Sequence, residues 1–82
     1  MPVFHFHIAR GDLFIRNHEG FERSDFAAAR LEAILSARYL MSSEVRRGEL
    51  RMDQAIHIHD AQDRHLGTVN FDDALRISQT AP

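Results

Sequence analysis

The chain of 82 residues contains no cysteine and no lysine. Without cysteine it has no disulfides, no thiolate zinc site and no thiol nucleophile. Without lysine it has neither Schiff-base chemistry nor the lysine of a phosphate-binding P-loop. The sequence has no run near the roughly 20 apolar residues of a membrane span, and its first residues lack the pattern of an export signal. We therefore expect a cytoplasmic protein with no membrane partner.

The composition is that of a folded globular domain, with 44% hydrophobic and 27% charged residues. The formal charge of -2 gives no general attraction for phosphate backbones, so we expect no nucleic-acid partner. Six histidines are present, and their protonation around pH 6 to 6.5 would reverse the sign of the formal charge. We predict a single domain at residues 1–77 and a disordered C-terminal tail at residues 78–82.

Alternating polar and apolar residues predict four strands, because side chains two apart on a strand point to the same face. These strands are expected at residues 3–8, 13–16, 54–60 and 65–71. Arg10, Gly11 and Asp12 indicate a hairpin turn between the first two strands. A turn around residues 61–64 makes a second hairpin of the last two, and Asp72 and Asp73 could cap a final helical turn at residues 74–77.

One long helix is predicted from about residue 26 to about residue 47. Ser24 or Asp25 can cap its first turn, and Arg46, Arg47 and Gly48 form a good C-terminal stop. The residues expected to face the sheet are Phe26, Ala29, Ala33, Ala37 and Leu40, flanked by Ile34 and Met41. The predicted fold is α+β, in the order strand-strand-helix-strand-strand, with one long helix packed on one face of a four-stranded, mainly antiparallel sheet.

A single helix covers only one face of such a sheet, so the other face should be open. His5, His7, His57 and His59 are expected there, because the residues that alternate with them are apolar. The paired imidazoles are close enough along each strand to share a zinc or nickel ion. An ordinary solvated or interface face has the same pattern. His7 is also expected to be a structural strand residue or a contact residue.

The helix carries a second apolar stripe, which we call the outer helix stripe: Leu31, Leu35 and Tyr39. Residues spaced by four lie on one side of a helix, and this side is turned away from the predicted core. Either the connector around Leu50 and Met52 covers the outer helix stripe, or the stripe contacts a second copy or another protein.

Several short motifs along the chain resemble a family of short bacterial proteins known only as a domain of unknown function. The matching residues are Met1-Pro2, Phe4, Phe6-His7, Arg10-Gly11-Asp12, Glu19-Gly20, Asp25-Phe26, Ala29-Arg30, Ala33, Ile56, Ile58, Asp60, Thr68-Val69, Phe71 and Asp73-Ala74. The resemblance supports the fold and transfers no activity. Histidine at positions 5, 57 and 59 departs from the pattern.

No nucleophile motif, glycine-rich phosphate loop or cofactor fingerprint is present, so we expect a protein that is not an enzyme and has no cofactor. The sequence favours a small module that acts by self-association, as a homodimer, or by binding a protein partner. The alternative from another class is a metal-binding or metal-sensing protein that uses the paired histidines to hold zinc or nickel.

Overall fold

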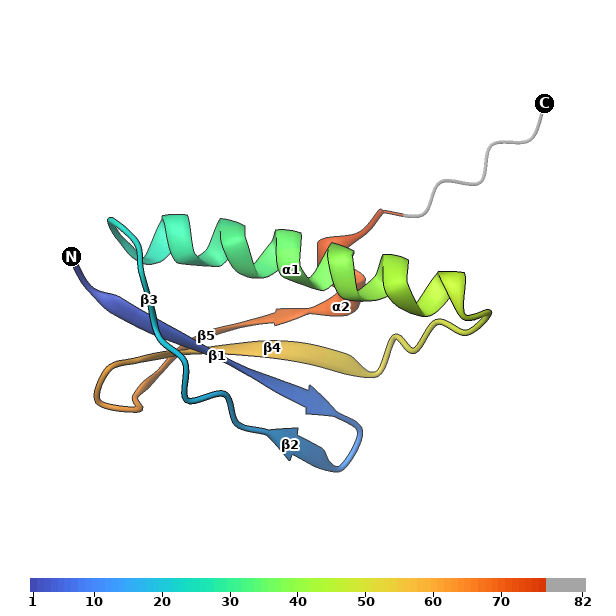
Figure 1. Ribbon diagram of the computed structural model, residues 1–82, viewed down its shortest axis with the longest axis horizontal. Coiled ribbons are helices and arrows are strands. Elements are labelled where there is room, and N and C mark those ends of the chain that lie inside the picture. Colours follow the sequence, from blue (N-terminus) through green and yellow to red (C-terminus); the bar gives the residue numbers. More distant parts are fainter. Residues whose placement is uncertain (77–82) are drawn as a thin grey trace.

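An antiparallel sheet with one long helix across it forms the protein, seen in a computed structural model that describes residues 1–76 (Figure 1). The strands are β1 (Val3–Arg10), β2 (Leu13–Ile15), β3 (Phe21–Glu22), β4 (Gln54–Asp60) and β5 (His65–Asn70). The helices are α1 (Phe26–Arg46) and α2 (Phe71–Ala74). The predicted α+β fold is thus confirmed. The predicted tail at 78–82 lies outside the described residues, as does residue 77.

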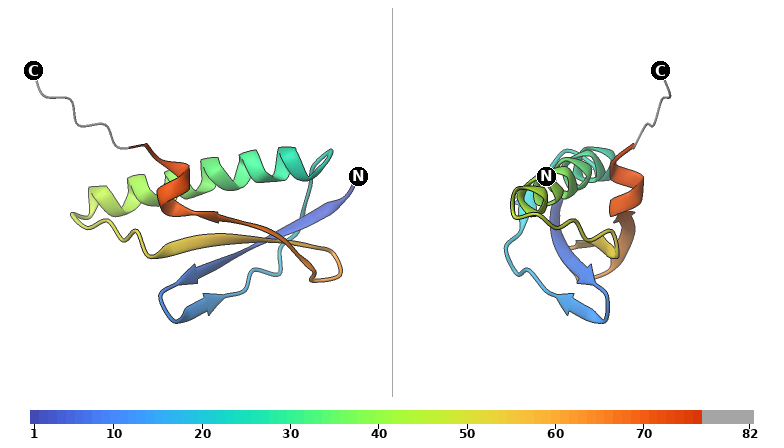
Figure 2. Two further views of the ribbon diagram at one scale, coloured as in Figure 1. Left: turned by 180° about the vertical axis from the view of Figure 1, so that it is seen from behind. Right: turned by 90° about the vertical axis from the view of Figure 1, so that its right-hand side faces the viewer.

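The strand order is β2-β1-β4-β5, and β3 pairs with the start of β1. All neighbouring strands are antiparallel. β1 and β4 are therefore direct neighbours in the centre, with His5 opposite His59 and His7 opposite His57. Viewed end on, the β1–β2 hairpin extends away from α1, so that β2 forms a free edge of the sheet (Figure 2).

The ends of α1 follow the local signals of the sequence. Asp25 caps the helix, because its Oδ1 accepts a hydrogen bond of 2.9 Å from the Ala28 amide. Beyond Arg46, Gly48 adopts φ +87°, the left-handed conformation that ends many helices at a glycine. The helix is continuous through Ser42 and Ser43.

The core lies between α1 and the sheet. Ala29, Ala33 and Ala37 are fully buried one turn apart, and their small side chains let the helix axis lie close to the strands. They pack in one cluster with Ile56 and Ile58 of β4. The cluster is completed by Phe4, Met41, Val69, Phe71 and Ala74, with Phe6, Phe21, Phe26, Ile34, Leu40 and Met52 at its margin.

A buried carboxylate ties the end of α1 to the sheet, which the apolar pattern does not predict. Glu44 is 7% exposed and accepts hydrogen bonds from Gln54 Nε2 at 3.0 and 3.1 Å and from the Arg51 amide at 3.2 Å. Arg10 Nη2 lies 3.7 Å from the same carboxylate. Burial alone would raise the pKa of Glu44, but these bonds and the arginine charge outweigh it and lower the pKa.

Several predicted boundaries differ from the structure, and one strand was not predicted. β2 ends at Ile15 rather than at residue 16, and β5 ends at Asn70 rather than at residue 71. β1 extends to Arg10, because Arg10 pairs with Leu13 directly across the turn. β3 was not expected, since two residues are too short to show a period, although Phe21 packs edge-on against Phe6 with ring centroids 4.5 Å apart. α2 begins at Phe71, earlier than the predicted turn.

Within residues 1–76, neither helix combines the length and apolar character needed to cross a bilayer.

Candidate functional site

The four predicted histidines lie on the sheet face turned away from α1, which we call the histidine face. The adjacent residues Phe4, Ile56 and Ile58 point to the helix and are buried in the core. The placement of the histidines is therefore as predicted, but the expectation of an open face is wrong for two of them. His7 is 3% exposed and His59 is 9% exposed, so neither presents a surface to solvent.

β2, the segment that follows it and the turn between β4 and β5 cover these imidazoles. Phe14 of β2 lies over the histidine face, with its ring centroid 5.6 Å from that of His7 and 5.4 Å from that of His57. The segment after β2 folds back over β1, and the Asn17 amide donates a hydrogen bond of 2.9 Å to His7 Nδ1. From the other side, the turn between β4 and β5 carries Asp63 to the cluster.

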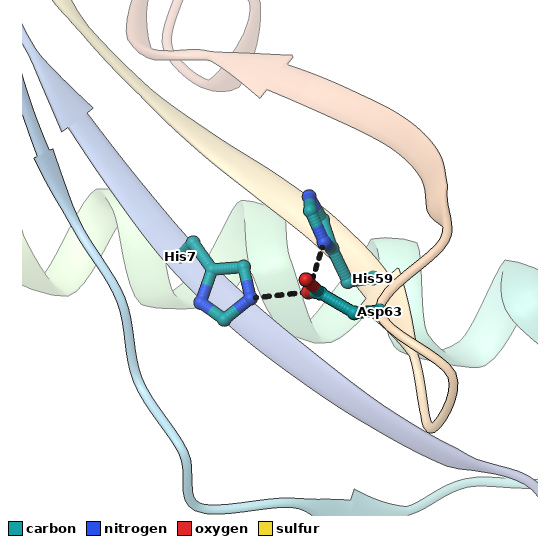
Figure 3. Close-up of side chains that lie close together, drawn as sticks. All are labelled: His7, His59 and Asp63. Atoms are coloured by element: carbon teal, nitrogen blue, oxygen red, sulfur yellow. Dashed lines mark hydrogen bonds and ion pairs between the residues drawn. The ribbon is translucent and has the colours of Figure 1, made fainter.

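Asp63 is the centre of the polar contacts on this face (Figure 3). Its Oδ1 lies 2.8 Å from His59 Nδ1 and 3.5 Å from His7 Nε2, and Arg16 Nη1 donates to both carboxylate oxygens at 3.0 and 3.1 Å. The bond from His59 and the charge of Arg16 lower the pKa of Asp63 to about 2. Asp63 is therefore an anion across the physiological pH range.

The contacts of His7 fix which of its ring nitrogens carries the proton. A backbone N–H can only donate, so His7 Nδ1 must offer its lone pair to Asn17. In the neutral ring the proton then sits on Nε2, which faces the Asp63 carboxylate without a formed hydrogen bond. Burial, followed by the neighbouring His59, lowers the pKa of His7, whereas Asp63 opposes this effect only in part.

The four predicted ligands do not converge on one point. Within residues 1–76, the one group of three side chains with ligand atoms within 4.8 Å of one another is His7, His59 and Asp63. His5 stacks on His7 with ring centroids 6.3 Å apart and is not in this group. His57 instead lies beside Thr68, whose Oγ1 is 3.5 Å from His57 Nδ1, and burial with nearby histidines lowers its pKa.

Sequence reasoning missed several residues of this face: Phe14, Arg16, Asn17, Asp63 and His65. Asp63 stands four residues after His59, but only the tight turn brings the two side chains together. Asp63 itself adopts φ +62°, a conformation that aspartate tolerates better than most residues. His65 could have been predicted from the pairing of β4 with β5, because it stands opposite His59, and the two ring centroids are 5.6 Å apart.

The second candidate region is a groove between α1 and the free edge of the sheet. This edge groove has a volume of about 640 Å³ and is lined by Phe6, Ile8, Ile15, Arg16, Asn17, Glu32, Leu35, Ser36, Tyr39, Leu40 and Ile56. Its rim is formed by two residues of the outer helix stripe, Leu35 and Tyr39, which are 48% and 75% exposed. Across it, Ile15 of β2 is 41% exposed.

The connector after α1 does not cover the outer helix stripe. Met52 packs against the core, and Leu50 lies in a different hollow, beside Met41 and Leu75. Leu31 is as open as its neighbours, at 57% exposed. The first of the two alternatives, cover of the stripe by the connector, is therefore wrong.

A family model described as Domain of unknown function (DUF6894) matches residues 3–72. The match spans every strand and all of α1. It confirms the resemblance inferred from the short motifs. Neither a curated protein nor a solved structure matches the chain.

Proposed function

This chain belongs to the DUF6894 family, and we propose that it acts by self-association, as a small non-enzymatic module whose contact surface is the outer helix stripe and β2. The observation that carries the proposal is that three large exposed apolar side chains, Ile15 of β2 and Leu35 and Tyr39 of α1, line the edge groove together. Leu13 and Phe14 of β2 and Leu31 of α1 are exposed as well. Isolated exposed apolar residues are ordinary, whereas contiguous ones are typical of interaction sites.

The size of this surface suits a dimer. At roughly 100 Å² for each half-exposed large side chain, the six residues would contribute on the order of 600 Å² per copy, near the about 800 Å² that each partner buries in a specific interface. The edge groove joins the helical and strand parts of the surface, since Leu35, Tyr39 and Ile15 all line it. The predicted contact role of His7 does not fit this surface, because His7 is buried on the other face.

The non-enzymatic part of the proposal is supported by the bonding of the histidine face. A carboxylate beside an imidazole resembles an acid-base pair, but His59 directs Nδ1 to Asp63 and hydrogen-bonds no hydroxyl within residues 1–76. The hydroxyl of Thr68 lies 2.8 Å from His65 Nε2 and 3.5 Å from His57 Nδ1, and within residues 1–76 neither of these imidazoles bonds a carboxylate that would orient it as a base. A carboxylate held by an arginine and two imidazoles is well suited to fastening a turn onto a sheet.

Sedimentation velocity of the wild type and two charged variants tests the proposed function. The wild type should approach the dimer mass at high micromolar concentration. Tyr39→Asp and Leu35→Asp should each weaken dimerisation at least tenfold, because a carboxylate would have to be desolvated in the interface. Val45→Asp is the matched control, since Val45 is an exposed α1 residue that lines other hollows.

Either of two outcomes would contradict the proposal, the first by excluding self-association and the second by excluding this contact surface. One is a wild type that stays monomeric throughout the concentration series. The other is a Val45→Asp variant that dissociates as much as the Tyr39→Asp variant, because the effect would then not belong to the edge groove.

Binding of zinc or nickel is the second candidate function. In its favour, His7, His59 and Asp63 present three ligand atoms within 4.8 Å, and the buried His7 Nε2 has no hydrogen-bond partner within residues 1–76. Against it, a metal on Nε2 would require that nitrogen to lose its proton while Nδ1 still accepts from Asn17. Histidine ligands almost always donate from their second nitrogen, so the bond to Asn17 would have to break.

Calorimetry with zinc and nickel salts tests this second function. One-to-one binding that is lost in His59→Ala but retained in His5→Ala would support a site at His7, His59 and Asp63. Loss of binding in a variant carrying both His5→Ala and His57→Ala, with His59 intact, would instead support the paired strand histidines. Weak affinity that is the same in every variant would contradict both sites.

A further inference from the structure

The free edge of β2 has a sequence that is complementary to itself when two copies run antiparallel. The segment reads Asp12, Leu13, Phe14, Ile15, Arg16, with an acid at one end, a base at the other and three apolar residues between. β2 is the last strand in the order β2-β1-β4-β5, so its far side carries backbone groups that no other strand of the sheet engages.

The hairpin geometry determines which backbone groups face this free edge. Arg10 and Leu13 pair across the two-residue turn formed by Gly11 and Asp12, and Gly11 has φ +56°. Residues that flank a two-residue turn exchange both of their ladder bonds, and the next pair of residues does not. Ala9 and Phe14 are that next pair, so the N–H and C=O of Phe14 point outward.

We propose that two copies of this chain associate by antiparallel pairing of β2 with β2 about a two-fold axis at Phe14, which joins their sheets into one. The proposal rests on the proposed function and specifies its geometry. A two-fold axis of this kind places the same residues of each copy in the interface. Because the axis runs perpendicular to the sheet, both α1 helices would lie on one face and both histidine faces on the other.

Among axes that pass through Asp12, Phe14 or Arg16, the charges of the segment favour the one at Phe14. With the axis at Phe14, Asp12 of one copy stands opposite Arg16 of the other, and this occurs twice. Axes at the other outward-facing positions would place Asp12 opposite Asp12, or Arg16 opposite Arg16, and like charges directly opposite destabilise a sheet. The Phe14 register therefore offers two opposite-charge pairs without a like-charge pair on the axis.

The side chains that this register brings together are also compatible by face. Leu13 would stand opposite Ile15 of the other copy on the α1 side, next to the edge groove. Phe14 would stand opposite Phe14 of the other copy on the histidine face, and aromatic cross-strand pairs of this kind are favourable. Arg16 bonds Asp63 through Nη1 alone, which leaves Nη2 and Nε to meet a second carboxylate.

A charge-swap experiment tests the pairing. Asp12→Arg and Arg16→Asp, each measured alone by sedimentation velocity, should dimerise about tenfold more weakly than the wild type, because each sets like charges opposite one another twice. An equimolar mixture of the two variants should recover an affinity near that of the wild type, as heterodimers. Asp72→Arg is the control for Asp12→Arg, because it makes the same charge change at an exposed position in α2.

Amide hydrogen exchange supplies a second readout that needs no substitution. The Phe14 amide should exchange rapidly in dilute protein and become protected as the concentration rises through the dimerisation range. A dimer that forms with Phe14 unprotected, and with no recovery in the mixture, would overturn the strand pairing and leave self-association standing. A wild type that never dimerises would overturn both.

Discussion

His7 shows how one hydrogen bond decides the chemistry of a side chain. The same imidazole could be a ligand, a proton carrier or a structural group. Its Nδ1 lone pair is committed to the Asn17 amide, and its Nε2 faces an ionised Asp63. Protonation of Nδ1 would break the bond to Asn17 and add a positive charge beside Arg16 and His59. The fold therefore favours the neutral ring.

This preference predicts that acid destabilises the protein in a specific window. Burial, then His59, lowers the pKa of folded His7 below 6.5, so the unfolded chain binds the proton more readily. The contribution of His7 to the free energy of unfolding should be fully present above pH 6.5 and should decrease as the pH falls below that value.

Urea unfolding at about pH 7.5 and about pH 5.5 measures this effect. His7→Asn should lose less stability between the two pH values than the wild type, because asparagine can still accept from Asn17 without titrating. The remaining loss is expected from His57, whose pKa is lowered for the same reasons. His18→Asn, at an exposed position, should behave as the wild type does. Equal pH dependence in the His7 variant and the wild type would contradict the assignment.

Among the elements, α1 depends on small residues for its distance from the sheet. Ala29, Ala33 and Ala37 leave no exposed surface, and opposite the start of the helix a Cβ added at Gly67 would lie 2.7 Å from Phe26 Cζ. Helix and sheet therefore meet along a line that has no room for larger side chains.

Ala33→Leu should accordingly destabilise the protein by about 1–3 kcal/mol, because the added atoms must displace the helix or neighbouring side chains. Ala27→Leu, at an exposed position of the same helix, should change the free energy of unfolding by less than about 0.5 kcal/mol. Chemical denaturation of both variants measures the difference. Similar values for the two positions would mean that the close helix-sheet contact is not required for stability.

The elements also show what could be predicted from the sequence. α1 and both hairpins have local signals, such as the Asp25 cap, Gly48 and the turn at Gly11, and these elements appear as predicted. The placement of the histidines also followed from alternation. The cover over His7 did not, because it depends on a segment without periodicity, residues 16–20, and on a tight turn that brings in Asp63. Glu44 was missed because its partners come from three separate segments.

In the whole molecule, the two faces of the sheet are covered in different ways. α1 closes one face with an apolar core, and the other is closed by a polar network around Asp63 with Phe14 over it. The side with β2 and the outer helix stripe remains, where Leu35 and Tyr39 stay exposed. Since both sheet faces are covered near the centre, this side is the surface that a second copy is expected to occupy.

The most direct measurement of that claim is an isotope-filtered NOE experiment on a mixture of labelled and unlabelled chains at high concentration. It detects contacts only between copies and identifies the residues that make them. We predict intermolecular NOEs from Leu13, Leu35 and Tyr39. No intermolecular NOEs at millimolar concentration, or NOEs confined to residues outside the edge groove and β2, would contradict the account.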